Sequence, residues 1–243
     1  MLDGATHQDQ RLAFAVMAKA PQLGRVKTRL VPPLTQEQAT QLGESFLVDS
    51  IAVVRAVANR VPVQPYIAYM PVGSEALMRT IVGDDVDFVL ADGALIDDPG
   101  VTGIGRSLLH ATRSLLSQGH PGVCLISADS PSLPAAVLAE AAALLARPGD
   151  RLVLGPAEDG GYYLIGLKAA HAAIFRDIHW STEIVAAETR ARAAAIGLEC
   201  AMLPPWYDID DQAALTRLSV ALATGAEVAP CSALVLQRFG LAA

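Results

Sequence analysis

Hydrophobic residues along this chain form short continuous runs that alternate with stretches of helical spacing. Apolar runs of strand length occupy residues 12–18, 61–69, 86–90, 123–126 and 151–154, and helix-spaced apolar residues occupy 35–59, 74–81, 106–116 and 135–147. Runs without polar alternation are typical of parallel strands covered on both faces, and helices that join such strands build βαβ units. The pattern predicts a three-layer α/β/α protein with a Rossmann-like sheet.

The alternation of strand and helix breaks after residue 154. A turn over residues 155–161 leads into another strand-like run, 162–167, without an intervening helix. The turn contains Asp159, Gly160 and Gly161, and an Asp-Gly pair often makes a β-hairpin. The glycines would also let a ligand approach the backbone closely, and Asp159 would accept hydrogen bonds from a hydroxyl or a base edge. We predict a change in sheet topology here, as a plain hairpin or as a hairpin that lines a site.

The last third of the chain is predicted to return to helices. A helix is expected over 183–196, with Ser181 or Thr182 as its N-cap, followed by a short strand over 199–203 and a helix over 212–222. Trp180, just before the first of these helices, is either a core residue or a wall against the ring of a ligand. Residues 225–243 give no prediction.

The composition indicates one folded domain without nucleic-acid or membrane partners. Of the 243 residues 52% are hydrophobic and 18% charged, so a single domain is expected over 11–243, after a loose polar tail over 1–10. The net charge of −7 and the aromatic content of 5% argue against nucleic acid. The apolar stretch 135–146 is too short to cross a bilayer, and no targeting signal opens the chain, so we expect a cytoplasmic protein.

An aspartate follows the apolar run 123–126. Asp129 stands at the carboxyl end of this predicted strand, where open α/β sheets bind ligands. A hard cation such as Mg²⁺ takes one or two carboxylates and leaves its other positions to water and substrate phosphates. Asp129 is thus a candidate metal ligand, and the alternative is that it caps the following helix.

A basic loop follows the first predicted strand. Residues 19–30 carry Lys19, Arg25, Lys27 and Arg29 around Gly24, with no acid among them, in a chain that is acidic as a whole. Lys27 as a mobile point charge and Arg29 as a planar fork would hold a di- or triphosphate. The loop lacks the Walker and G-x-G-x-x-G patterns, so the alternative is an ordinary solvated basic loop.

Three more acids lie close together just before the last predicted helix. The segment 206–211 is predicted as the end of a strand and contains Asp208, Asp210 and Asp211. One of these aspartates would complete the metal site begun by Asp129. Capping of the helix over 212–222 by Asp210 or Asp211 is the alternative, and both readings are compatible.

Four blocks of this sequence together resemble a known family. They are KAPQLGRVKTRL, SADSPSLP, GPAEDGGYYLIGL with the following HWST, and YDIDD, and in order and spacing they cover about residues 12–218. On these blocks the chain is similar to the rSAM/selenodomain-associated transferase 1 family. The resemblance implies a glycosyltransferase-A-type fold, akin to nucleotide-diphospho-sugar transferases and to small nucleotidyltransferases.

The resemblance also implies roles for single residues. The loop with Gly24, Lys27 and Arg29 is similar to the phosphate-contacting segment of the family, and Asp129 to the aspartate that coordinates the metal. Asp210, with Asp208 as its substitute, is similar to a late metal-facing aspartate. Residues 159–161 are similar to a substrate-facing turn.

One segment departs from the family pattern. Family members commonly carry G-D-L-G-x-R before the third helix, whereas this chain has Thr102-Gly103-Ile104-Gly105-Arg106-Ser107. The acid is absent and the arginine stands one place early. No acceptor-binding or acid/base role is therefore carried over to this segment.

The predicted function is a glycosyltransferase that depends on Mg²⁺ or Mn²⁺, with Lys27, Arg29 and Asp129 as catalytic residues. The donor would be a nucleotide-diphospho-sugar and the acceptor a small molecule, and neutralising the leaving diphosphate would be the main source of catalysis. Lys19, Gly24, Arg25, Trp180 and the 159–161 turn would bind substrate or nucleotide. One alternative is a nucleotidyltransferase that transfers NMP from an NTP to a small phosphorylated substrate. Another is a nucleotide-binding protein without catalytic activity.

Overall fold

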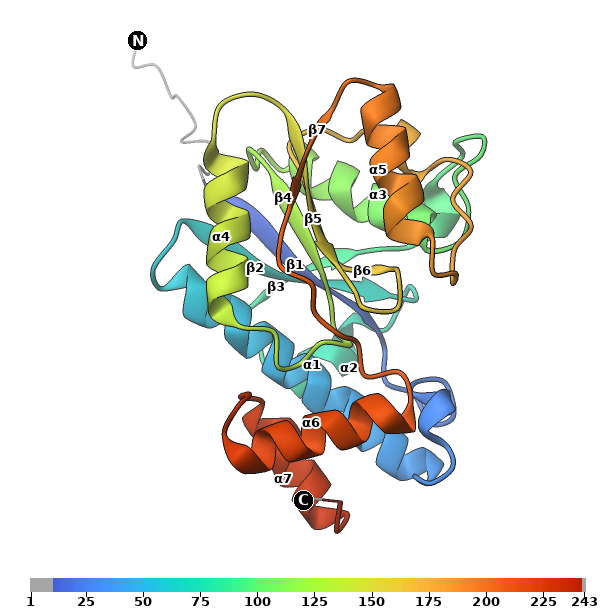
Figure 1. Cartoon of the computed structure of the whole chain (residues 1–243), viewed down its shortest axis with the longest axis vertical. Helices are drawn as coiled ribbons and strands as arrows, with labels where there is room; N and C mark the ends of the chain where they lie inside the picture. The colour runs from blue at the N-terminus through green and yellow to red at the C-terminus, as the bar shows by residue number, and fades with distance from the viewer. Residues whose placement is uncertain (1–10, 242–243) are drawn as a thin grey trace.

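One mixed sheet of seven strands runs through the middle of the molecule (Figure 1). The computed structural model describes residues 11–241, and the tail expected over residues 1–10 lies outside them. The strand order is β3-β2-β1-β4-β6-β5-β7. The strands are β1 (Leu12–Lys19), β2 (Val63–Met70), β3 (Asp87–Leu90), β4 (Val123–Ser127), β5 (Arg151–Pro156), β6 (Tyr162–Leu167) and β7 (Glu199–Met202).

Helices cover both faces of this sheet. On one face lie α1 (Gln36–Ala58), α2 (Glu75–Val82) and α4 (Ala135–Ala146), and on the other lie α3 (Gly103–Ser117) and α5 (Val185–Ala195). Side chains of β1 alternate between two buried clusters: Phe14 and Val16 pack under the first group of helices, and Ala13 and Ala15 under the second. The three-layer α/β/α prediction is confirmed.

The predicted change in topology is also present. Strand β1 pairs in parallel with β2 and β4, whereas β6 is antiparallel to both β4 and β5. The turn over residues 157–161 connects β5 to β6, and β6 inserts between β4 and β5. The hairpin interpretation of this turn is therefore correct, and the turn reaches the same sheet edge as the loop after β4.

The beginning of α5 differs from the sequence prediction. The helix begins at Val185, and its N-cap is Ile184, which makes no side-chain capping bond. Ser181 has a left-handed backbone with φ 64°, and the Thr182 hydroxyl donates to the His179 carbonyl at 2.6 Å. Neither residue caps the helix, because both belong to the irregular segment before it.

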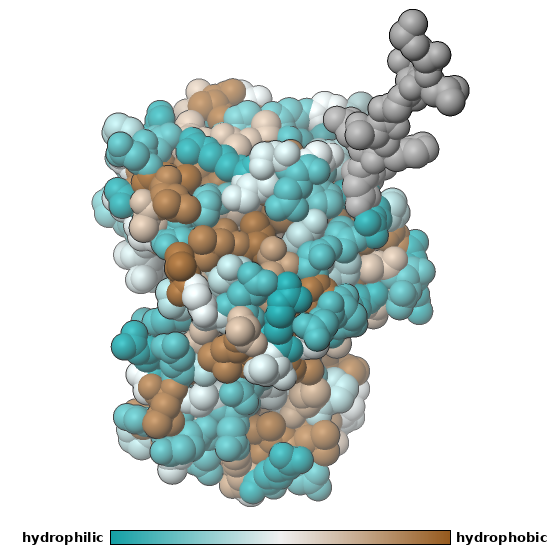
Figure 2. Space-filling view, turned by 180° about the vertical axis from the view of Figure 1, so that it is seen from behind, coloured by the Kyte–Doolittle hydropathy of each residue, from teal (hydrophilic) through white to brown (hydrophobic). Residues whose placement is uncertain are grey.

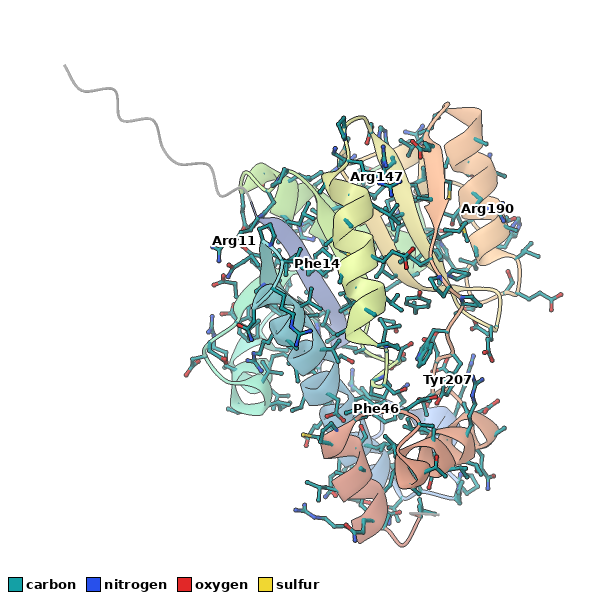
Figure 3. All side chains as sticks on the ribbon, turned by 60° about the vertical axis from the view of Figure 1, so that its left-hand side comes forward. Arg11, Phe14, Phe46, Arg147, Arg190 and Tyr207 are labelled. Atoms are coloured by element: carbon teal, nitrogen blue, oxygen red, sulfur yellow. The ribbon has the colours of Figure 1, made fainter. Side chains whose placement is uncertain are left out.

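A third buried cluster lies beside the sheet, where α6 (Gln212–Thr224) and α7 (Pro230–Arg238) pack against the first turns of α1. Phe46 of α1 and Tyr207 belong to this cluster, well away from Phe14 in the sheet (Figure 3). Asp49 of α1 is only 2% exposed and accepts bonds from the Ser232 N–H and hydroxyl and from the Cys231 N–H, at 2.6 to 3.0 Å. The sequence pattern did not predict α7.

The surface mixes hydrophobic and hydrophilic atoms, as the rear view shows (Figure 2). Within residues 11–241, no helix combines the length and the apolar character that crossing a membrane requires.

Candidate active site

The site lies where the adjacent parallel strands β1 and β4 end. Met17 of β1 pairs with Ser127 of β4, so the loops that follow these strands leave the sheet at one edge. The loop after β1 carries the basic residues, and the loop after β4 carries Asp129. The carboxyl ends of neighbouring parallel strands are where open α/β sheets bind ligands.

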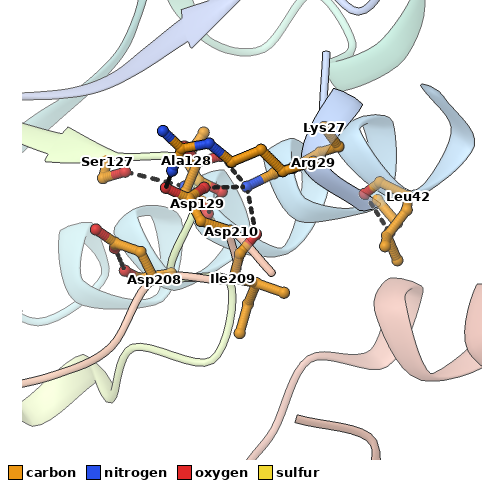
Figure 4. A network of polar contacts seen from close by, with 12 residues as sticks. Lys27, Arg29, Leu42, Ser127, Ala128, Asp129, Asp208, Ile209 and Asp210 are labelled. Carbon is orange, nitrogen blue, oxygen red and sulfur yellow. Dashed lines mark hydrogen bonds and ion pairs between the residues drawn. The ribbon is translucent and has the colours of Figure 1, made fainter. Parts of the chain in front are cut away.

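A backbone hydrogen bond brings the late acids to Asp129. The predicted strand end over 206–211 is instead a single bridge between Trp206 and Ala157, followed by irregular chain. The Ile209 N–H donates to the Asp129 carbonyl at 2.9 Å. Asp208 and Asp210 flank this bond, so three carboxylates gather at the edge of the sheet (Figure 4).

Lys27 lies between two of these carboxylates. Its ammonium is 2.6 Å from Asp129 Oδ1 and 3.3 Å from Asp210 Oδ1, and it donates to the Ile209 carbonyl at 2.7 Å (Figure 4). The Lys27 side chain is 7% exposed, whereas each aspartate side chain is 45% exposed. Arg29 is mostly exposed, with a guanidinium nitrogen 3.9 Å from Asp210 Oδ2. The basic loop and the acids predicted from sequence thus meet, with Lys27 bound to protein oxygens.

Asp208 is half-buried beside the other two acids. Its pKa is raised from 3.8 to about 6, mainly by burial and to a smaller extent by the negative charges of Asp129, Asp210 and Asp159, while a hydrogen bond from the Ser130 hydroxyl opposes the shift. Among residues 11–241, no cation forms an ion pair with Asp208, whereas Lys27 pairs with both of its neighbours. The cluster therefore keeps an uncompensated carboxyl group beside the cleft.

Of the aspartates considered as helix caps, only Asp211 caps a helix. The N-cap of α4 is Pro134, which makes no side-chain bond, so Asp129 does not cap this helix. Asp211 does cap α6, accepting a bond from the Ala214 N–H at 2.8 Å. Asp129 and Asp210 are thus left for the cleft, as the metal-ligand interpretation requires.

Two adjoining cavities open at this sheet edge. The smaller, of about 280 Å³, is bounded by the basic loop, with Lys19, Arg25, Lys27 and Arg29 in its wall. The larger, of about 580 Å³, extends between α3, β6 and the segment before α5. Both share a wall that contains the same four charged residues, Lys19, Arg29, Asp129 and Asp210. The four predicted basic residues and the two paired acids therefore lie around one divided cleft.

The three glycines predicted to bind substrate lie in different positions relative to the two cavities. Gly161 lines the larger cavity together with Asp159, whose carboxylate accepts a bond from the Gly161 N–H at 2.9 Å. Gly160 has φ 91°, and a Cβ there would overlap the backbone carbonyl of Glu183, so glycine is required by packing against the segment before α5. Gly24 has φ 69° and shapes the basic loop, but it lines neither cavity.

Trp180 lines the larger cavity and packs on the divergent segment. A Cβ on Gly105 would lie 2.6 Å from Trp180 Cζ2, and one on Gly103 would lie 3.0 Å from Trp180 Cδ1. Both glycines are needed for the indole to lie across the beginning of α3. The divergent segment at 102–107 thus supports Trp180, and Ile104 and Leu108 contribute apolar wall to the larger cavity.

The donor set at Lys27 fits a hard cation. Two carboxylate oxygens and one backbone carbonyl converge on a single positively charged atom, and these are the oxygen ligands that Mg²⁺ and Mn²⁺ accept. In this structure the ammonium takes that place. No three His, Cys, Asp or Glu side chains among residues 11–241 are arranged to hold a metal ion. The predicted metal dependence stays a prediction.

Sequence reasoning did not identify several residues of the cleft. The Ile209 carbonyl, which binds Lys27, gives no sequence signal because every residue has a carbonyl. Ser130, which donates to Asp208, stands next to Asp129 and is a polar residue in a buried loop, which is a usable signal. Glu183 and Thr182 reach the larger cavity only because the segment before α5 is irregular.

The fold is that of nucleotide-diphospho-sugar transferases. The chain belongs to the family described as an uncharacterized protein conserved in bacteria (DUF2064), whose model matches residues 53–182. A search of curated protein sequences finds no match. The narrower rSAM-associated family inferred from the motifs stays a prediction.

Solved structures show the same architecture. A protein from Desulfovibrio desulfuricans G20, provisionally named a nucleotide-diphospho-sugar transferase, is 24% identical with a TM-score of 0.77, and the match covers 94% of each chain. Glucosyl-3-phosphoglycerate synthase from Mycobacterium tuberculosis, in complex with Mn²⁺ and UDP, is 12% identical (TM-score 0.51; 96% of this chain, 81% of that one). A nucleotidyl transferase from Methanothermobacter is 17% identical (TM-score 0.50; 85% and 95%). At these identities the likeness establishes the fold.

Proposed function

We propose that this protein is a glycosyltransferase that uses Mg²⁺ or Mn²⁺, a nucleotide-diphospho-sugar donor and a small acceptor without negative charge. The smaller cavity would take the diphosphate, and the larger one the sugar and the acceptor. The proposal agrees with the fold and with the division of the cleft into two compartments at Asp129 and Asp210.

The distribution of charge between the cavities carries this proposal. The larger cavity contains five acids and two cations, and both cations, Lys19 and Arg29, belong to the wall shared with the smaller cavity. The remainder of the larger cavity combines acids such as Asp159 and Glu183 with apolar surface from Trp180. A phosphorylated co-substrate needs cations around its phosphate, so this compartment suits a neutral sugar and acceptor.

The chain would act mainly by positioning and by charge. The cations of the basic loop would hold the diphosphate, and their charge would stabilise it as the bond to the anomeric carbon breaks. Asp129 and Asp210 would hold the divalent ion, which when bound supplies further positive charge to the leaving group. Trp180 would orient the sugar or the acceptor and exclude water. The acceptor hydroxyl would bond to the anomeric carbon as the bond from that carbon to the diphosphate breaks, and its proton would pass to water or to a carboxylate of the larger cavity.

Nucleotidyl transfer is the second candidate, and the basic loop is the observation in its favour. Four cations over residues 19–29 suit the larger charge of a triphosphate, and pyrophosphate would then leave from the same place. The anionic co-substrate of that reaction would have to bind in the acidic compartment. For this reason we place nucleotidyl transfer second.

The products distinguish the candidates. The protein is incubated with Mg²⁺, a set of neutral hydroxyl acceptors, and UDP-, GDP-, ADP- or dTDP-sugars or the parent triphosphates. Metal-dependent release of a nucleoside diphosphate from one nucleotide-sugar supports glycosyl transfer. Release of pyrophosphate from a triphosphate with a phosphorylated co-substrate would establish the second candidate, and no turnover with stable nucleotide binding would establish a non-catalytic nucleotide-binding protein.

A further inference from the structure

The ammonium of Lys27 has no free hydrogen-bond donor. A lysine ammonium carries three N–H groups, and three protein oxygens receive them: Asp129 Oδ1, Asp210 Oδ1 and the Ile209 carbonyl. The Lys27 side chain is only 7% exposed, so these protein oxygens are its main partners. In this arrangement Lys27 cannot donate to a phosphate, although it stands in the wall of the diphosphate compartment.

The same three oxygens are suitable ligands for a divalent ion. An ammonium and a metal ion cannot share one position, because both need the same lone pairs and repel each other. We propose that Lys27 is the resident counter-ion of the Asp129–Asp210–Ile209 oxygen site, and that a divalent ion enters when a phosphate of the donor draws the ammonium out. This inference rests on the proposed function and assigns Lys27 the role of a positioning residue for the metal.

The surroundings of Lys27 favour such an exchange. Its backbone has φ 49° and ψ 34°, at the beginning of the short helix Thr28–Leu30, so its side chain leaves the chain within the basic loop. The ammonium lies over the ring of Phe46, 5.2 Å from its centroid, at the end of a flexible four-carbon stem. Turning outward moves the charge into the compartment that Arg25 and Arg29 already line. There the ammonium replaces carboxylate partners by phosphate oxygens and keeps its charge compensated.

Metal and nucleotide must then bind cooperatively. A metal ion alone competes with an ion pair that is already formed, whereas a diphosphate removes the competitor and supplies further oxygen ligands. By linkage, the metal raises the affinity for the diphosphate by the same factor.

Mn²⁺ binding to the full chain, measured from the electron paramagnetic resonance signal of free Mn²⁺, tests the exchange. Wild-type protein should bind Mn²⁺ weakly alone and more tightly with one of UDP, GDP, ADP or dTDP. Lys27→Met should bind Mn²⁺ without nucleotide about tenfold more tightly than wild type. A change of this size lies within the usual range of coupling between two binding sites. The added effect of the nucleotide should shrink in this variant. Lys27→Gln is a second neutral variant for the case that Lys27→Met does not fold, which circular dichroism reports.

Lys19→Met is the matched control. Lys19 lines both cavities, so this variant removes the same charge from the same cleft and leaves the oxygen site filled by Lys27. Its Mn²⁺ affinity without nucleotide should stay within about twofold of wild type. An equal gain in both variants would show a general charge effect and overturn the exchange.

Two other results also decide the question. If wild type binds Mn²⁺ cooperatively with a nucleotide but Lys27→Met shows no gain, the exchange is wrong and the proposed function stands. If no nucleoside diphosphate increases Mn²⁺ binding to wild type, the proposed function fails and the exchange fails with it.

Discussion

The backbone N–H of Ile209 donates to the backbone carbonyl of Asp129 at 2.9 Å, which fastens the segment before α6 to the loop after β4. This backbone bond joins the segments that carry Asp129 and Asp210, in addition to the Lys27 ammonium that contacts both carboxylates. Replacement of either carboxylate by its amide should therefore leave the arrangement of the two segments intact.

Asp129→Asn should lower metal-dependent turnover by about 10²-fold or more, because a neutral amide cannot hold the cation that stabilises the leaving group. The variant should keep its fold, since the backbone bond to Ile209 is unchanged. The measurement is the rate of nucleoside diphosphate release at saturating Mg²⁺. Asp85→Asn, at an exposed carboxylate paired with Arg55, is the control and should retain full turnover. Intact activity of Asp129→Asn would show that the catalytic site is assigned wrongly.

Asp208 should make stability fall with rising pH. Its pKa of about 6 lies above the value of 3.8 for an unperturbed side chain, so between these values the native state binds the proton more tightly than the unfolded state. The free energy of unfolding should decrease as pH rises from 4 to 6, by up to about 3 kcal/mol. Asp208→Asn should remove this loss, and its stability relative to wild type should therefore increase with pH.

Urea unfolding at pH 4, 5, 6 and 7.5, with EDTA to exclude metal ions, measures this difference. Asparagine can still accept the bond from the Ser130 hydroxyl, which keeps the comparison confined to charge. A difference between Asp208→Asn and wild type that is the same at every pH would show that the carboxyl group does not titrate in this range.

Asp49→Ala should destabilise the protein by about 2–4 kcal/mol, because it leaves two backbone N–H groups and one hydroxyl at the beginning of α7 without their acceptor. Asp85→Ala is matched in chemistry but removes a carboxylate that is 72% exposed, so it should cost less than about 1 kcal/mol. Urea unfolding of both variants at pH 7 checks the pair. Equal costs would mean that Asp49 does not hold α7 in place.

Gly160→Ala should cost clearly more than Gly119→Ala. Both glycines have a left-handed backbone, with φ 91° and 97°, so both substitutions carry a similar conformational cost of about 1–3 kcal/mol. The added methyl group at 160 would overlap the Glu183 backbone, whereas nothing lies within 4 Å of the one at 119. The difference in unfolding free energy should be about 1–3 kcal/mol. A difference near zero would show that the segment before α5 can move away from the added methyl group without a loss of unfolding free energy.

The order of layers could be predicted from sequence, because a strand that is buried on both faces of the sheet is a continuous run of hydrophobic residues. The runs over 12–18 and 123–126 contain no polar residue, and they are β1 and β4, the centre of the sheet. The α7 helix left no such pattern, since its nine residues bury only Ser232 and Leu236 fully. Its position depends on Asp49 in α1, a contact that no local spacing reveals.

The meeting of acids and cations at one edge could likewise be predicted, because the ends of parallel strands share an edge. The pairing within the site could not. Lys27 turns toward Asp129 through its left-handed backbone, and the third partner is the carbonyl of Ile209. The sequence predicts a hairpin at Gly160 that is either plain or open to close approach by a ligand, and what lies against Gly160 is the backbone of Glu183.

The bonds of Asp49 also bear on the order of events during synthesis. Domains form from the N-terminus as the chain emerges, and α1 with six of the seven strands precedes residue 168. Asp49 cannot make its three bonds until Cys231 and Ser232 have been made. The nascent chain therefore carries a sheet whose first helix has an uncovered acid, Asp49, near its middle, and the third cluster closes last, when the final helix has been made.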